Sequence, residues 1–173
     1  SGDFTIDTWV NTSATSYGIF YVQREGGNLT NTSVAFYLSA TGGLRFLASD
    51  GSTWGVNIST SQTINDGNWH HVAIVRNGND WDIYIDGKSE ANTTTNITIP
   101  NSTVNPKIGI QFDGSNAPFN GYLDEFRITK GTARWSSDFA VPTAPYDDAT
   151  ITIANSSGND WTASRASVTG DTE

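Results

Sequence analysis

The 173-residue chain contains neither cysteine nor methionine, and only three of its residues are lysine. Without cysteine there is no disulfide framework and no thiolate metal site. Its apolar runs are a few residues long, far below the roughly 18 residues that a membrane-spanning helix needs, so no membrane insertion is expected. The sequence starts without methionine and has no signal-peptide pattern, which favours a processed or excised chain.

Positive charge is also scarce. Nine Lys and Arg stand against 18 Asp and Glu, which gives a net charge of −9 and a pI of about 4.4. Because an acidic surface repels phosphate backbones, nucleic acid is not expected as a partner. Of the acids, 14 are Asp, a residue typical of turns and of cation ligands. The polar, lysine-poor composition predicts an extracellular or virion-surface location.

Short segments with apolar residues at every second position recur along the chain, separated by Asp-Gly and Asn-Gly pairs. These pairs favour the positive φ angles of tight hairpin turns. Many short strands with turn signals between them indicate an all-β antiparallel sandwich or barrel. Residues 91–105 are rich in Thr and Asn and are interpreted as a loop with one short strand at 97–99. The predicted strands are 4–10, 17–23, 33–40, 43–48, 53–58, 69–76, 81–85, 107–112 and 122–129.

Ordered motifs make the pattern specific in the second half of the chain. The stretch DGNWHHVAIVR at 66–76 precedes WDIYIDGK at 81–88, and NGYLDEFRI at 120–128 precedes TKGTARW at 129–135. This series resembles the laminin G-like domains of the concanavalin A-like lectin and glucanase superfamily, over residues 1 to about 146. The resemblance implies an antiparallel jelly-roll β-sandwich, with residues 147–173 as a polar tail, an extra strand or a linker.

The resemblance also implies a missing strand at the start. Such domains usually have a strand before the one that begins here at Asp3. Its absence would leave a sheet edge or a groove open, which is a hazard for unwanted strand pairing. We expect the tail strand near 150–154, or a neighbouring chain, to cover this edge by strand addition.

Calcium is a candidate cofactor on the strength of the resemblance. Pentraxins place a metal between an early loop, represented here by Asn28, and a late acidic loop, represented by Asp113. Related laminarinases hold a structural calcium with an Asp in a closing strand comparable to that of Asp124. Calcium takes six to eight oxygen ligands. The alternatives stay open: Asp113 also fits a plain turn, and Asp124 fits a buried carboxylate bonded to backbone N–H groups.

Lectin sites combine an aromatic face with Asp or Asn groups for hydroxyls. Trp9 and Trp69 lie inside predicted strands and are therefore expected in the core. For the other candidate rings a core position remains the alternative, although their polar neighbours lie at loop tips, where binding residues concentrate. The candidate ligand-binding residues are Asp50, Trp54, Asn79, Asp80, Trp81 and Trp135.

Enzyme signatures are missing from the sequence. Asp124 and Glu125 are neighbours, as are His70 and His71, so on a strand each pair points to opposite faces. A glycosidase needs two carboxylates that face each other. With these signatures missing, the resemblance implies a non-catalytic carbohydrate-binding or adhesion module of a phage virion or bacterial surface protein, with a cell-surface glycan as partner and a homo-oligomeric assembly. The alternative is a structural virion or filament subunit with no glycan ligand.

Overall fold

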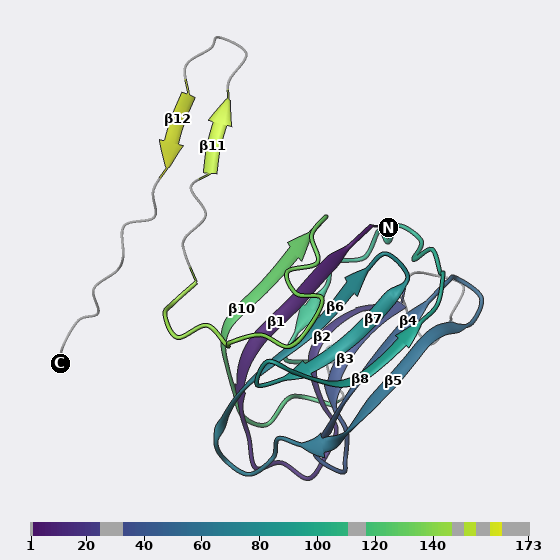
Figure 1. Ribbon diagram of the computed structural model, residues 1–173, viewed down its shortest axis with the longest axis vertical. Coiled ribbons are helices and arrows are strands. Elements are labelled where there is room, and N and C mark those ends of the chain that lie inside the picture. Colours follow the sequence, from purple (N-terminus) through teal and green to yellow (C-terminus); the bar gives the residue numbers. More distant parts are fainter. Residues whose placement is uncertain (1, 25–32, 111–116, 147–150, 155–159, 164–173) are drawn as a thin grey trace, which may run out of the picture. The chain divides into compact units, whose positions relative to one another are not determined.

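The computed structural model describes residues 2–24, 33–110, 117–146, 151–154 and 160–163 (Figure 1). The chain divides into two compact units, Ser1–Val141 and Pro142–Glu173. Every regular element in the described ranges is a β-strand. No helix there has the length and apolarity needed to cross a membrane.

The larger unit is a sandwich of two five-stranded sheets in which all strand pairs are antiparallel (Figure 1). This confirms the predicted all-β, jelly-roll class. The first sheet runs in the order β10 (Tyr122–Lys130), β1 (Phe4–Asn11), β6 (Trp69–Asn77), β7 (Asp80–Ile85) and β8 (Lys88–Thr94). The second sheet runs in the order β5 (Trp54–Thr63), β4 (Gly43–Ser49), β3 (Ser33–Leu38), β2 (Gly18–Arg24) and β9 (Lys107–Ile108).

The smaller unit contains one antiparallel pair, β11 (Ile151–Ala154) and β12 (Asp160–Ala163). The tail strand predicted to cover an open sheet edge thus pairs with β12 in a separate two-stranded sheet. This pairing uses one edge of β11. Coverage of the open edge of the sandwich by the tail strand or by a neighbouring chain stays a prediction.

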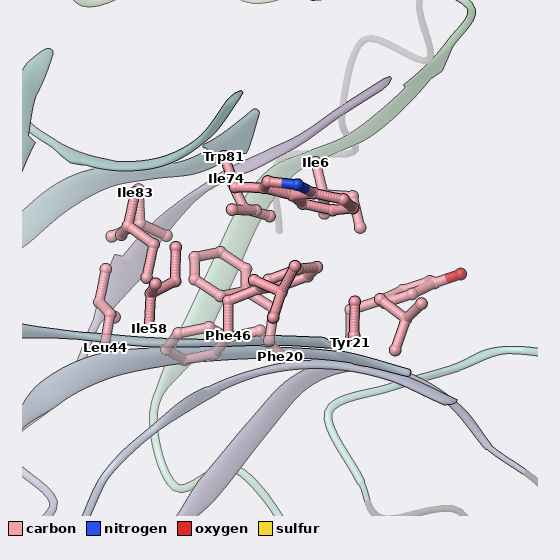
Figure 2. Packing of buried hydrophobic residues seen from close by; sticks show 14 of the residues in the cluster. Ile6, Phe20, Tyr21, Leu44, Phe46, Ile58, Ile74, Trp81 and Ile83 are labelled. Carbon is pink, nitrogen blue, oxygen red and sulfur yellow. The ribbon is translucent and has the colours of Figure 1, made fainter. Parts of the chain in front are cut away.

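The core lies between the two sheets of the sandwich. Figure 2 shows Ile6, Ile74 and Trp81 of the first sheet facing Phe20 and Phe46 of the second. The Trp81 ring is stacked at 6.0 Å from Phe46, and all five side chains are buried. Full burial of such a side chain contributes roughly 1.5–3 kcal/mol, so this layer stabilises the packing of the two sheets.

The outer face of the first sheet is partly covered by residues 131–141, which we call the strap. Arg134 N donates to Thr5 Oγ1, and Phe139 N donates to the Gly87 carbonyl at 2.8 Å, so the strap crosses from β1 to the β7–β8 turn. The rings of Trp135 and Phe139 stack at 3.8 Å, and both lie edge-on to His71. The middle of strand β6 is therefore covered on both faces.

A buried ion pair lies on the same outer face. The Asp7 carboxylate is fully buried and accepts two hydrogen bonds from Arg127, at 3.1 and 2.7 Å. The His71 Nε2 lies 3.4 Å from the same carboxylate. Asp7 and Arg127 are cross-strand partners of β1 and β10, so the pair ties the edge strand to the sheet.

Candidate functional site

Four of the predicted ligand-binding residues lie at one end of the sandwich. Asp50 and Trp54 belong to the β4–β5 turn, and Asn79 and Asp80 to the β6–β7 hairpin. The two turns are connected through Ile97, which packs against Gly55 and whose carbonyl accepts a 2.8 Å hydrogen bond from the buried Arg76. Their gathering at one end is a property of the fold that the sequence alone does not give.

The polar groups of this end are largely used by the protein itself. The Asp50 carboxylate caps its own turn by accepting the N–H groups of Thr53 and Ser52, and these hydrogen bonds lower its pKa. Asp80 accepts a 2.6 Å hydrogen bond from the Thr94 hydroxyl. A carboxylate that already accepts hydrogen bonds from the protein has less capacity to bind a ligand. Asp50 and Asp80 are therefore better explained as groups that stabilise their turn and their strand pair.

The two aromatic residues predicted beside these acids differ in position. Trp54 is half-buried, and the Arg24 guanidinium lies over its ring, 5.5 Å from the centroid. Trp81 is fully buried between the sheets, and its indole N–H donates to the Thr95 carbonyl at 3.1 Å. The prediction of Trp81 as an exposed platform is therefore wrong, because its position on β7 faces the core.

Trp135 belongs to the strap rather than to a loop tip. It is half-buried, with one face stacked on Phe139 and its edge toward His71, while the Arg134 guanidinium lies 5.9 Å from its ring centroid. The ring thus serves mainly to close the outer face of the first sheet.

The calcium candidates are only partly visible. Asn28 and Asp113 lie outside the described residues. Asp124 is exposed, so the alternative interpretation as a buried carboxylate is wrong. Across the described ranges no three His, Cys, Asp or Glu side chains gather as a metal site would require. Calcium binding stays a prediction.

A cavity of about 560 Å³ opens at the same end as the β6–β7 hairpin. Its apolar walls include Phe4, Tyr21 and Ile128. Ile128 pairs with Ile6 and shares its inward face, yet it is 41% exposed. The sandwich is therefore open beside the edge strand β10.

Two large aromatic side chains lie exposed and adjacent at the opposite end of the first sheet. Trp69 is 47% exposed and Tyr122 is 70% exposed. Their ring centroids are 6.5 Å apart, and the ring planes are inclined at 46°. Both residues are cross-strand partners of Asn11, so the three side chains form a row across β6, β1 and β10. Neither ring belongs to the core.

A second row lies next to the first on the same face. Trp9 pairs with Asp124 across β1 and β10, two residues away from the pair of Asn11 and Tyr122. Because alternate residues of a strand share a face, both pairs lie on the same face of the sheet. Trp9 is half-buried with its ring edge-on to that of His71 at 5.4 Å. The exposed Asp124 accepts the Glu125 N–H through Oδ1, which leaves Oδ2 as an acceptor. We call Trp9, Asn11, Trp69, Tyr122 and Asp124 the aromatic patch.

The backbone around the patch is fixed by close contacts between turns. The Asn11 amide donates to the Gly67 carbonyl at 2.8 Å, and Gly67 N donates to the Thr12 carbonyl at 2.9 Å. Gly121 runs so close to β1 that a Cβ there would collide with the Asn11 carbonyl oxygen. Both rings are thus the first residues of strands whose preceding turns are anchored, which presents them in a fixed arrangement.

The residue after Trp69 anchors the same region through charge. The His70 imidazole bridges Asp86, at 2.8 Å, and Asp66, at 3.1 Å. Burial lowers the pKa of His70, but the hydrogen bonds and charges of Asp86 and Asp66 together outweigh it and raise the pKa above 6.5. Hydrogen bonds from Asn68 and then from His70 lower the pKa of Asp66 to about 2. The turn that carries Trp69 is therefore bordered by the ionised carboxylate of Asp66 at neutral pH.

Sequence reasoning missed the patch. Trp69 was expected in the core, and this is wrong because its face of β6 extends beyond the cover of the strap. Tyr122 is the second exposed ring that sequence reasoning misses. A usable signal is present, since each ring directly follows a turn ending in Gly or Gly-Asn, as expected for the rim of a sheet. Flat rings beside amide and carboxylate acceptors can hold a ligand that presents both C–H faces and hydroxyl groups.

Comparisons with known proteins agree with this fold. A family model described as the concanavalin A-like lectin/glucanases superfamily matches residues 1–137. A protein of Bacteroides ovatus described as carbohydrate-binding superposes with a TM-score of 0.60 at 20% identity over 78% of this chain and 38% of that one. Domains LG4-5 of the mouse laminin alpha1 chain give 0.58 at 17% identity, over 76% and 36%.

A third similar structure is the CBM40 module of a Ruminococcus gnavus sialidase bound to alpha2,3 sialyllactose, with a TM-score of 0.60 at 14% identity over 73% of this chain and 74% of that one. This chain spans well under half the length of the first two structures. No curated protein matches the sequence. At these identities the likeness to solved structures concerns the fold.

Proposed function

The chain belongs to the concanavalin A-like lectin/glucanase superfamily, and we propose that it is a non-catalytic carbohydrate-binding module that holds sugars on the aromatic patch. The observation that carries the proposal is the pair of exposed rings, Trp69 and Tyr122, on either side of Asn11. Rings of this size are normally buried because water contact is unfavourable, so two held side by side in solvent suit an apolar ligand face.

The polar members of the patch supply the second half of a sugar site. Asn11 uses its amide nitrogen on Gly67, which leaves its carbonyl oxygen to accept from a hydroxyl. Asp124 accepts the Glu125 N–H through Oδ1, and its Oδ2 can likewise accept a hydrogen bond from a sugar hydroxyl. Two rings and two acceptors offer a sugar few contacts, so one patch binds weakly. Several copies on one assembly would raise the avidity.

The absence of catalysis is part of the proposal. Among the carboxylates that the structure describes around this region, Asp66 and Asp86 are hydrogen-bonded to His70, which fixes them as structural groups. Asp124 and Glu125 are neighbours on β10, at a β-bulge in which Glu125 has a φ of 51°. None of these arrangements supports two carboxyl groups that flank a glycosidic bond.

The setting proposed for the module follows from its surface and its relatives. The Bacteroides ovatus protein and the Ruminococcus gnavus module are named for carbohydrate binding, which supports a glycan ligand here. A polar surface with few lysines suits an extracellular or virion-surface protein that meets cell-surface glycans. A homo-oligomer, as in a phage tail fibre or a bacterial adhesin, would supply the multivalency.

A binding experiment with patch variants tests the proposal. The full chain is screened against immobilised oligosaccharides and its strongest ligand is measured by calorimetry. Trp69→Ala and Tyr122→Ala should each weaken binding about tenfold, which is about 1.4 kcal/mol. Tyr17→Ala is the matched control, because Tyr17 is 54% exposed and packs on Tyr37 of the second sheet.

Two results would contradict the proposal. Equal binding by the wild type and both patch variants would show that the rings do not hold the sugar. Loss of binding in Trp54→Ala alone would move the site to the opposite end of the sandwich.

A further inference from the structure

We infer that the aromatic patch selects neutral oligosaccharides over acidic ones and requires a ligand long enough to contact both Trp69 and Tyr122. This inference rests on the proposed function, and it adds the chemical class and the minimum length of the ligand. It is carried by the inclination of the two rings and by the charges around them.

The ring geometry sets the length requirement. Neighbouring strands lie about 4.8 Å apart, so residues on β6 and β10, with β1 between them, have Cα atoms separated by roughly twice that distance. The centroids of Trp69 and Tyr122 are only 6.5 Å apart, so the rings lean toward each other above Asn11. Because their planes differ by 46°, one flat sugar ring cannot stack on both. Two sugar units, turned relative to each other, are needed to use the full patch.

The charge distribution sets the chemical class. None of the five residues of the patch is basic, and Asp124 places a carboxylate on its surface. The next basic side chain along β10, Arg127, is bound to Asp7 by two hydrogen bonds. His70 is mostly buried and lies between two carboxylates. Within the part of the chain that the structure describes, the nearby Arg127 and His70 are thus already paired with carboxylates. An acidic sugar would approach a negative field, whereas a neutral sugar can donate hydroxyl protons to the same acceptors.

The hydroxyl contacts explain why the carboxylate is useful rather than harmful. A carboxylate only accepts hydrogen bonds, and hydrogen bonds to a charged acceptor are roughly twice as strong as neutral ones. Asp124 therefore suits a ligand rich in hydroxyl groups and without charge. The related fold of the module bound to sialyllactose does not fix the ligand class, because only 14% of the residues are identical.

The experiment compares neutral and acidic probes on the full chain. Calorimetric affinities are measured at low and at physiological ionic strength for cellohexaose, xylohexaose, maltohexaose and hexagalacturonic acid, and for lactose and alpha2,3-sialyllactose as a pair that shares one disaccharide. We expect the preferred neutral hexasaccharide to bind at least tenfold more tightly than the acidic one, and lactose more tightly than sialyllactose. Added salt should reduce this discrimination by screening.

Two further measurements isolate the causes. Asp124→Asn should raise the ratio of acidic to neutral affinity, because the amide removes the negative charge. Affinity for the preferred neutral series should rise at least tenfold from the monosaccharide to the tetrasaccharide, and Trp69→Ala should abolish this rise by leaving a single ring.

The outcomes separate the inference from the proposed function. Acidic probes that bind as tightly as neutral ones overturn the neutral class and leave carbohydrate binding in place. A monosaccharide that binds as tightly as a hexasaccharide overturns the length requirement. If no probe binds and the wider oligosaccharide screen is also empty, both the inference and the proposed function fail.

Discussion

Arg127→Leu leaves the Asp7 carboxylate fully buried without its two short hydrogen bonds. Removing one partner of a buried pair costs about 3–5 kcal/mol, because the Asp7 carboxylate loses its guanidinium partner while it stays out of water. The contact of the carboxylate with His71 Nε2, at 3.4 Å, is unchanged in the variant. The edge strand β10 also loses its cross-strand tie to β1. For a domain of this size, each kcal/mol shifts the melting temperature by about 2–4 °C. We therefore expect a fall of roughly 6–20 °C.

The same substitution elsewhere provides the control. Arg45 also makes two hydrogen bonds to one side-chain oxygen, that of Asn57, at 3.0 and 2.9 Å, but on an exposed surface. Water replaces those bonds in the variant, so Arg45→Leu should cost at most about 1 kcal/mol. The two variants differ mainly in whether the acceptor is a buried charge.

A double variant identifies the charge as the cause. In Asp7→Asn combined with Arg127→Leu, the buried group is a neutral amide, so the double variant should be more stable than Arg127→Leu alone. Urea unfolding followed by tryptophan fluorescence gives the free energy of unfolding for each protein. Equal losses in Arg127→Leu and Arg45→Leu, or a double variant less stable than Arg127→Leu, would refute the reasoning.

Two other predictions concern the turns that frame the outer face. Because the folded pKa of His70 is raised by Asp86 and Asp66 against the effect of burial, its contribution to stability is complete below about pH 6.5, the unfolded value. This contribution of His70 to the free energy of unfolding declines as the pH rises through the folded pKa. Urea unfolding from about pH 5.5 to 8.5 should show the decline in the wild type and not in His70→Asn. Gly87→Ala should be strongly destabilising, since its φ is 76° and an added Cβ would collide with a carbonyl oxygen of the strap. Gly78→Ala, with a φ of 61° and nothing within 4 Å of the new Cβ, should cost only about 1–2 kcal/mol from the backbone conformation; equal melting temperatures for the two alanine variants would contradict the contact with the strap.

The alternation of apolar residues predicted the strands that bury one face. Phe4, Ile6 and Val10 face the core from β1, as their spacing indicates. The Asp86-Gly87 pair does form a tight turn with two positive φ angles, 50° and 76°. Such strands can be predicted from the sequence because burial of one face places an apolar residue at every second position. Turn residues then mark where each strand ends.

Strand β8 was missed for the same physical reason. Lys88–Thr94 forms the edge of the first sheet, and its side chains are exposed or half-buried, so no apolar period marks it. The reverse error occurred at 97–99, where a short strand was predicted. Ile97 is buried there by packing against Gly55, outside any strand. Burial can thus occur without a strand, and a strand can form without burial at a sheet edge.

The tryptophans show why the site itself was not predictable. The run from Val72 to Val75 is continuously apolar because the strap covers Ala73 and Val75 on the outer face while the core covers Val72 and Ile74 on the inner face. A strand buried on both faces loses its alternation, so the sequence cannot say which face Trp69 occupies. The strap covers β6 only as far as His71, where Trp135 and Phe139 lie edge-on to the imidazole. Trp69, two residues further along the same face, is left in solvent beside Tyr122, so the end of the strap decides where the aromatic patch begins.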